Sequence, residues 1–293
     1  MYFPKMVRMS RMNTLASHIV VVALVLLGLS GCGSKAYEDK FDASLEEYQR
    51  ETPFKDLLKE YASAGDDQFS IRLPRMYGQE NSYALDELTS DPRHPDQPLH
   101  PNRIQPDFVK LPGYVRTYEH HVEMPGTKGK LLRPVCVYLA IISSTDGTLD
   151  ELKDDLRAQL VAHFGELPEE EEVPKTFNTR TKVAPPAGVS AWEEFAAPSI
   201  KGGTVDWEKL TAHGVQTFQY YNQEDNHKRD EVLDKTLDGK YILYVRSDET
   251  HHVMVAWRAL LTVDEKMNIE KLADASVGTV RVGTGEDDPT DDQ

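Results

Sequence analysis

Two pairs of adjacent histidines are the side chains in this sequence best suited to bind a metal: His120-His121 and His251-His252. Zinc is usually held by three or four side chains that converge in a tetrahedron. Consecutive residues of a strand point to opposite faces of a sheet, so each pair offers one ligand to each face. If the two strands are neighbours, His120 and His252 can share a zinc ion, with a carboxylate completing the set. The carboxylates near them in sequence are Glu119, Glu123 and Asp248. The competing interpretation is that these histidines lie at strand ends on the surface.

The sequence lacks the common catalytic motifs. It contains no G-x-S-x-G, H-E-x-x-H, C-x-x-C or G-x-G-x-x-G pattern. Residues 126–130 are rich in glycine and lysine, but Leu131 stands where a phosphate loop has the serine or threonine that holds magnesium. This segment therefore predicts a hairpin turn, and no cofactor is expected.

Cys136 is one of two cysteines and lies in the apolar run 135–142. A catalytic thiol needs an electropositive and partly exposed setting. An apolar run is typical of a core strand, where cysteine acts as a small hydrophobic residue. We therefore expect Cys136 to be buried and inert.

The N-terminus has the three regions of an export signal in order. Basic residues come first (Lys5, Arg8 and Arg11), and an apolar run of eleven residues, 19–29, follows. This run is too short to span a bilayer, which takes about 20 residues. It ends in Leu-Ser-Gly-Cys at residues 29–32.

Residues 29–32 resemble the lipobox of bacterial lipoproteins, an aliphatic residue and two small residues before a cysteine. The resemblance implies that diacylglycerol is attached to the Cys32 sulfur and that a signal peptidase cuts between Gly31 and Cys32. It also implies that the new amine is often acylated, and two or more acyl chains give a stable anchor. Gly33 stands where Asp often signals retention in the inner membrane, which favours the outer membrane. The competing interpretation is an ordinary signal peptide followed by a chance cysteine.

The chain is acidic, with a formal net charge of -16. Removal of residues 1–31, which carry three bases and no acid, lowers this charge to -19. Such a surface repels phosphate backbones, so nucleic acid is not an expected partner. Basic proteins and metal cations are compatible with it, as is a simple need for solubility.

Seven prolines lie between residues 74 and 112, and four of them are spaced by three residues: Pro92, Pro95, Pro98 and Pro101. A polyproline II helix has three residues per turn, so these four would line one edge. Such an edge can dock into an aromatic groove. We favour an extended connector instead, either wrapped on the domain or mobile.

Apolar periodicity predicts the regular elements. A helix with a capping box is expected at 149–164 and a last helix near 269–280. Strands are expected near 118–122, 135–142 and 215–221, with a hairpin formed by 241–245 and 253–261. This order predicts an α+β fold, an antiparallel sheet with helices packed on it. The order loosely resembles the sandwich of the PsbP/Mog1-like group, and no motif supports carrying a function across.

The predicted organisation has five parts. A signal peptide (1–31) comes first. The second part (32–64) holds the lipid anchor, a short tether at 33–37 and a helix predicted from the spacing of Phe41, Leu45 and Tyr48. Pro53 ends or restarts this helix, and the helical spacing continues at Phe54, Leu57, Leu58 and Tyr61. A Pro-rich extended connector (65–112), the α+β domain (113–283) and an acidic disordered tail (284–293) follow.

Two classes of function stay open. The first, which we favour, is an exported envelope lipoprotein that is held by membrane lipid through acylated Cys32 and binds an envelope protein or supports envelope structure without catalysis. The second is an anchored hydrolase, metal-dependent if His120 and His252 converge. A deep pocket with convergent polar groups would favour the enzyme, and a flat or grooved surface would favour the binding protein.

Overall fold

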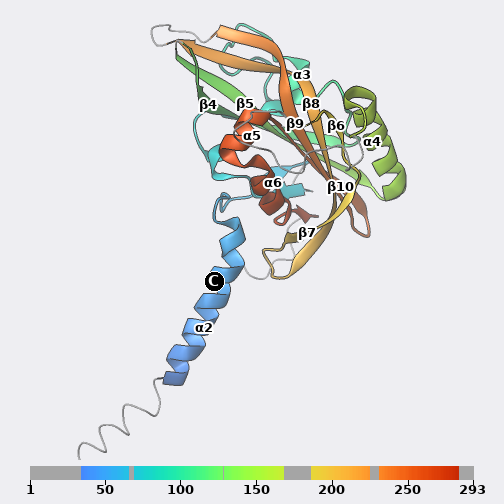
Figure 1. Cartoon of the computed structure of the whole chain (residues 1–293). Coiled ribbons are helices and arrows are strands. Elements are labelled where there is room, and N and C mark those ends of the chain that lie inside the picture. The colour runs from blue at the N-terminus through green and yellow to red at the C-terminus, as the bar shows by residue number, and fades with distance from the viewer. Residues whose placement is uncertain (1–33, 66–68, 128, 168–185, 225–230, 284–293) are drawn as a thin grey trace, which may run out of the picture. The chain divides into compact units, whose positions relative to one another are not determined.

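The computed structural model describes residues 34–65, 69–127, 129–167, 186–224 and 231–283 (Figure 1). The signal peptide, the cleavage site at Gly31 and Cys32, and the acidic tail lie outside these residues. The chain divides into two units, and the boundary in the sequence falls between Thr52 and Pro53. Within the described residues, no helix has the length and apolarity needed to cross a bilayer.

The first unit contains α2 (Ser34–Glu51), a helix of 18 residues. The predicted helix around Phe41 is confirmed, but residues 34–37 are part of it and are not an extended tether. Of the two roles left open for Pro53, the end of the helix is the one observed, because a 3-10 turn, η1 (Thr52–Phe54), follows α2 and the helical spacing after Pro53 forms no helix. Leu57, which we expected on a helix, forms an isolated bridge with Pro74.

The second unit is built on a sheet of antiparallel strands, and the predicted α+β class is confirmed. The strands follow the order β3 (Ser82–Ala84), β4 (Tyr114–Pro125), β5 (Gly129–Ser143), β10 (His251–Leu260), β9 (Glu231–Ser247), β8 (Thr204–Glu224) and β6 (Gly188–Val189). A further strand, β7 (Glu193–Pro198), pairs with the first part of β8. The last residues of β8 also pair with the first residues of β5, so four strands close into a ring at one end.

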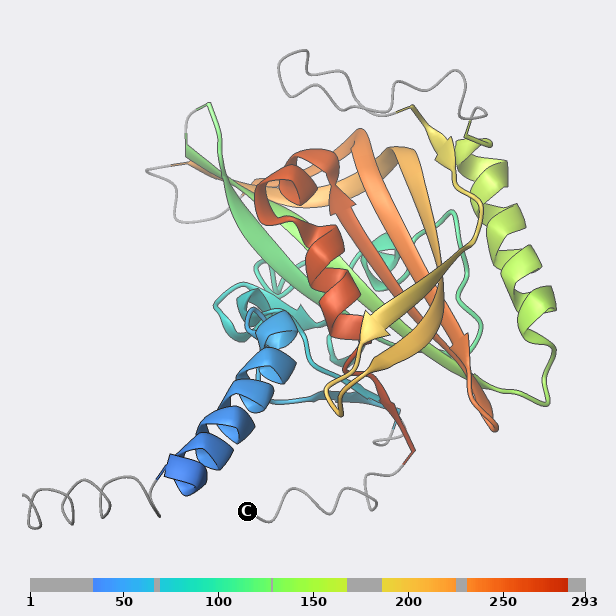
Figure 2. The same cartoon turned by 60° about the horizontal axis from the view of Figure 1, so that its bottom comes forward.

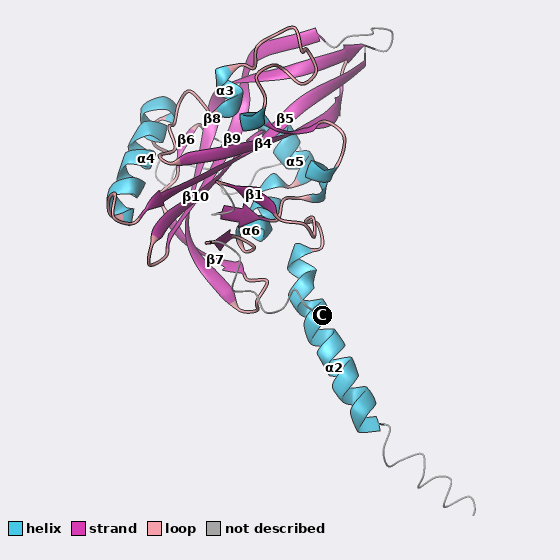
Figure 3. Ribbon diagram, turned by 180° about the vertical axis from the view of Figure 1, so that it is seen from behind, coloured by secondary structure: helices cyan, strands magenta, loops and turns pink. Residues whose placement is uncertain are grey.

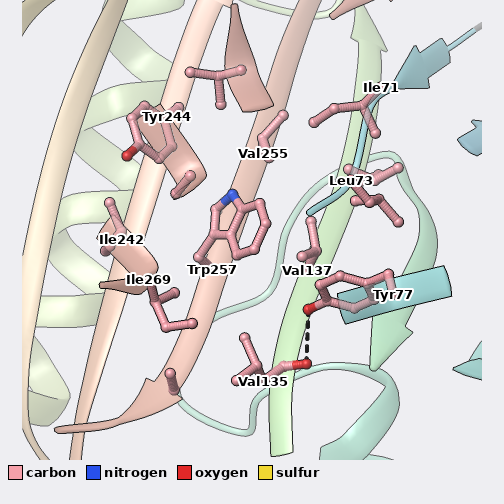
Figure 4. Close-up of a cluster of buried hydrophobic side chains, with 14 of the residues drawn as sticks. Ile71, Leu73, Tyr77, Val135, Val137, Ile242, Tyr244, Val255, Trp257 and Ile269 are labelled. Atoms are coloured by element: carbon pink, nitrogen blue, oxygen red, sulfur yellow. Dashed lines mark hydrogen bonds between the residues drawn. The ribbon is translucent and has the colours of Figure 1, made fainter. Parts of the chain in front are cut away.

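The sheet has a hydrophobic core on each face. On one face, Trp257 packs among Val255, Ile242 and Val137, and the Tyr77 hydroxyl donates to the Val135 carbonyl at 2.9 Å (Figure 4). On the other face, the core includes Cys136, whose burial is confirmed at 3% exposure. Neighbouring residues of β5 enter different cores, as the alternation of a strand requires.

Helices lie on both faces of the sheet (Figure 2). The helix α4 (Leu149–Phe164) contributes to the Cys136 core, whereas α5 (Leu261–Met267) and α6 (Ile269–Val277) contribute to the Trp257 core. A second, three-stranded sheet, β1 (Ala62–Ala64), β2 (Phe69–Ile71) and β11 (Arg281–Val282), lies beside α6 (Figure 3). Both predicted helices are therefore present, and α4 has the predicted bounds because the Thr148–Glu151 capping box forms.

The Pro-rich segment is wrapped on the domain. It contains the 3-10 turns η2 (Arg75–Gly78) and η3 (Leu85–Glu87), the strand β3 and the short helix α3 (Pro101–Ile104). The four prolines spaced by three do not form one polyproline helix, because the backbone turns back between Asp91 and Gln97. Of the interpretations left open, the wrapped connector is the one observed.

The compact unit begins at Pro53, which corrects the predicted domain start at residue 113. Phe54, Phe69 and Ile71 are each at most 1% exposed. Phe69 and Ile71 belong to the same core as Trp257, so residues before 113 contribute to the interior of this unit.

Candidate functional site

The two histidines proposed to share a metal lie far apart. Their strands, β4 and β10, flank β5 on opposite sides. His120 pairs with Val135 of β5 and His252 pairs with Ile142. Seven residues of strand correspond to about 23 Å, and an odd number of steps puts the two side chains on opposite faces. The structure therefore does not bring His120 and His252 together.

Each of these histidines binds a serine across its ladder instead. The His120 Nδ1 atom lies 2.8 Å from Ser82 Oγ, and His252 Nδ1 lies 2.7 Å from Ser247 Oγ. The Nε2 atom of His252 contacts the Gly147 carbonyl oxygen at 2.9 Å. Burial, followed by the influence of His121, lowers the pKa of His120 to about 4, so this ring is neutral at pH 7. Within the described residues, no group of three His, Cys, Asp or Glu side chains is placed to hold a metal ion.

A buried polar network is centred on Arg103. It lies on the face of β4 opposite to the side chain of His120, because Glu119 and His120 are consecutive residues of this strand. Arg103 of α3 contacts the Glu119 carboxylate through Nε at 3.2 Å and Nη2 at 2.5 Å. Its Nη1 atom donates to Asp91 at 2.5 Å and to the Tyr221 hydroxyl at 2.8 Å. Tyr221 donates in turn to Asp91 at 2.6 Å, and His121 Nε2 lies 2.7 Å from Glu119. The network thus ties the Pro-rich segment to strands β4 and β8.

The network is closed to solvent and its charges are balanced locally. Arg103 is 4% exposed and Glu119 is 0% exposed. Burial alone would raise the pKa of Glu119, but the charges of Arg103 and His121 outweigh it and hold that pKa well below its usual range. A carboxylate kept ionised by a permanent cation is a poor proton shuttle. We therefore interpret the network as a structural tie.

Cys136 lies beside this network, with its sulfur 3.8 Å from a Glu119 oxygen. Burial, reinforced by the negative charge of Glu119, raises the pKa of the Cys136 thiol to about 12. A thiol with this pKa is a poor nucleophile at neutral pH. A cavity bounded by Arg103, Glu119, Cys136 and Arg258 encloses about 20 Å³, which is room for about one water molecule.

An open cleft of about 660 Å³ lies between η2, β4 and the helices α5 and α6. Its lining mixes apolar side chains such as Met76 and Met267 with the cations Arg75 and Lys266. Lys266 donates to the Glu123 carbonyl at 2.8 Å. Glu123 lies on the part of β4 that continues beyond the residues paired with β3. The lining also includes the acids Asp56, Glu80 and Glu123, and such a mixture of apolar and charged side chains suits binding of a peptide or small molecule.

Sequence reasoning missed the Arg103 network because its members are distant in sequence. Asp91 and Arg103 lie within the segment interpreted as a connector, and Tyr221 lies more than a hundred residues later. The only local signal was the alternation of Glu119 and His121, which puts both on one face of β4. Comparison with known proteins adds nothing to this picture, since no protein-family model and no curated protein matches the chain.

Proposed function

We propose that this protein is a lipid-anchored lipoprotein of the cell envelope, whose domain binds a partner or supports envelope structure without catalysis. The single observation that carries the proposal is the Leu-Ser-Gly-Cys sequence at residues 29–32, directly behind a basic segment and a short apolar run. Membrane lipid is bound through acylated Cys32. Gly33 in place of Asp supports the outer membrane over the inner one.

Three features of the domain support a binding or structural role. The charged residues around Glu119 bind one another and are closed to solvent, which leaves them unsuited to act on a substrate. The cleft lined by Arg75 and Lys266 is open and of mixed character, and an open groove suits a binding surface. The acidic charge of the mature chain would attract a basic protein partner in the envelope.

Lipid attachment at Cys32 is the step to test first. Cells that express the full chain would be grown with labelled palmitate, and the protein would be recovered and separated by mass. Wild type should incorporate the label and lose residues 1–31, whereas Cys32→Ser should do neither, because serine cannot form the thioether.

The matched control is Cys136→Ser, which removes the other cysteine and should leave labelling intact. Equal labelling of wild type and Cys32→Ser would contradict the anchor. Loss of labelling in Cys136→Ser but not in Cys32→Ser would show that the lipid is attached to Cys136 and not to Cys32.

A further inference from the structure

The cleft between η2 and α5 has a free sheet edge along one wall. β4 is the outermost long strand of the sheet, and β3 pairs with it only at residues 118–120 (Figure 1). One further hydrogen bond, from the His121 N–H to the Asn81 carbonyl at 3.0 Å, ends this pairing. Beyond it, residues 122–125 of β4 pair with β5 alone in the described part of the chain. The cleft lies beside these residues, since its lining includes His121, Val122 and Glu123.

The backbone of Glu123 faces this cleft. In an antiparallel sheet, alternate residues direct their N–H and C=O groups to the same side, so Glu123 repeats the direction of His121. The hydrogen bond from Lys266 Nζ to the Glu123 carbonyl shows that this side is the one toward α5. No residue of β3 pairs with Glu123. Its N–H group is therefore placed to donate to a further strand.

The cleft also has the space and the lining that an added strand needs. The chain before Asn81 forms the 3-10 turn η2 instead of extending β3 along β4. This leaves about 660 Å³ between η2 and α5. Met76 and Val122 are buried in its wall and Leu272 is partly buried there, so alternate side chains of an extended segment would find apolar contacts.

We propose that this cleft binds an extended basic segment of a partner protein, which adds to β4 as a short strand beside residues 121–125. The inference deepens the proposed function, because it names the kind of partner that the binding domain takes. Main-chain hydrogen bonds to Glu123 provide affinity in this mode of binding, and the side-chain contacts of the cleft provide specificity.

The charges of the cleft indicate a basic segment. Asp56 and Glu80 are exposed in the lining, and neither has an ion pair in the described part of the chain. The two cations of the lining are instead bound to backbone carbonyls, Lys266 at 2.8 Å and Arg75 at 3.4 Å. The acidic charge of the whole chain also attracts a cationic segment from a distance.

Lys266 has a second interpretation that the test must separate from the first. A lysine at a free edge is one way in which proteins protect a strand from pairing with other chains. Lys266 is exposed, so its side chain can move away when a peptide N–H takes its place on the Glu123 carbonyl. Under our proposal, Lys266→Ala should therefore bind the peptide at least as tightly as wild type.

Peptide selection tests the proposal with a substitution in the backbone of β4. Phage that display short random peptides would be selected on residues 33–293 and counter-selected against Glu123→Pro, and enriched peptides would be synthesised and titrated. Proline removes the N–H that faces the cleft and leaves the pairing with β5, because that N–H does not face β5. The Kd should rise about tenfold in Glu123→Pro. Glu123→Ala is the matched control, which keeps the N–H and should raise the Kd by at most about threefold.

A second measurement leaves the protein unchanged. Each backbone nitrogen of an enriched peptide would be methylated in turn, and binding to the wild-type chain would be measured. Binding should fall at alternate positions, because every second N–H of an added strand faces β4. A loss without this period would overturn strand addition. So would a failure to enrich any peptide on wild type over Glu123→Pro, or a loss of binding in Lys266→Ala as large as in Glu123→Pro.

Two further outcomes complete the test. Enriched peptides should carry an excess of Lys and Arg over the starting library, and a composition without this excess would overturn the basic character of the partner. Residues 33–293 lack Cys32, so none of these results depends on lipid attachment. Failure of palmitate labelling would contradict the anchor and leave the peptide site standing, whereas failure of the peptide selection would do the reverse.

Discussion

Arg103 is the cation between two carboxylates that are themselves closed to solvent. Asp91 and Glu119 each contact the guanidinium at 2.5 Å. A buried ion pair contributes little net stability compared with apolar residues of the same size. Loss of one member has a much larger effect, because the remaining charge stays buried without its partner. Arg103 therefore holds α3 together with Thr117 and Arg258, which donate to the Ile104 and Asn102 carbonyls.

Arg103→Ala should lower the free energy of unfolding by about 3–5 kcal/mol, because it leaves both carboxylates buried and without their cation. Urea unfolding followed by circular dichroism would measure this change. Arg116→Ala is the matched control, since Arg116 also pairs with two carboxylates, Asp86 and Glu87, but is 25% exposed. A surface pair of this kind is worth at most about 1 kcal/mol. Similarly small losses of unfolding free energy in the two variants would show that the Arg103 network does not hold α3 on the sheet.

At the scale of elements, α5 and α6 are held on the sheet by two lysines from neighbouring strands. Lys209 of β8 donates to Glu270 at 2.7 Å and to Asp274 at 2.9 Å. Lys240 of β9 contacts Asp264 at 3.1 Å and also binds Glu270. Glu270 thus joins both lysines, and its ionised form contributes to the attachment of α6 beside the contacts of Asp274 with Lys209 and Tyr244.

This attachment should depend on pH. Burial alone would raise the pKa of Glu270, but hydrogen bonds from Lys209 and Lys240 outweigh it and lower that pKa to about 2 from a reference value of 4.5. A carboxyl group with a lowered pKa in the folded state stabilises fully above its unfolded pKa and loses this contribution as the pH falls through the folded one. The contribution of Glu270 should therefore be complete above about pH 5 and should decline between pH 4.5 and 2.

Urea unfolding at a series of pH values would measure the difference in unfolding free energy between wild type and Glu270→Gln. The difference should be largest near pH 7 and should shrink as the pH falls below 4.5. Comparison with Glu265→Gln controls for general charge effects, because Glu265 is an exposed acid of the adjacent helix with no ion pair in the described part of the chain. A Glu270→Gln difference that stays constant from pH 7 to 3 would contradict the role of this carboxylate.

Elements set by local sequence were predicted well, and those set by distant contacts were not. The helix α4 begins and ends as predicted because its signals, Thr148 with Glu151 and the closing Gly165, are adjacent to it. The strand β8 is 21 residues long, whereas periodicity predicted only 215–221. Its extra length depends on pairing with β7, β9 and β5, which no local pattern reveals.

The same distinction explains the error in the zinc hypothesis. His120 was predicted on a strand and His252 directly before one, at 253–261, and the structure has both histidines on strands. Whether the two strands are neighbours depends on sheet order, which apolar periodicity does not determine. β5 lies between them and separates the histidines.

At the scale of the whole molecule, the two cores draw on residues from both ends of the compact unit. Ala64 and the buried apolar side chains between Phe69 and Tyr77 belong to the same core as α5 and α6. Residues 108–111 pack with α4 on the other face. Phe54 and Phe69 are as fully buried as Trp257. The N-terminal part of this unit is therefore as much a part of the core as the strands that follow it.

Fragments of the chain would show how far the fold depends on this early segment. Residues 53–293 should fold and unfold cooperatively in urea, because they include every element of the compact unit. Residues 113–293 keep all strands from β4 onward but lose the buried side chains of Phe54 and Phe69, and they leave Glu119 buried without Arg103. Each lost aromatic side chain removes about 3–5 kcal/mol from a total that is only about 5–15 kcal/mol for a typical domain. The shorter fragment should therefore show no cooperative transition by circular dichroism and should bind dyes that detect exposed apolar surface. A cooperative transition in residues 113–293 would support the predicted domain start at residue 113. It would also show that the domain folds without residues 53–112.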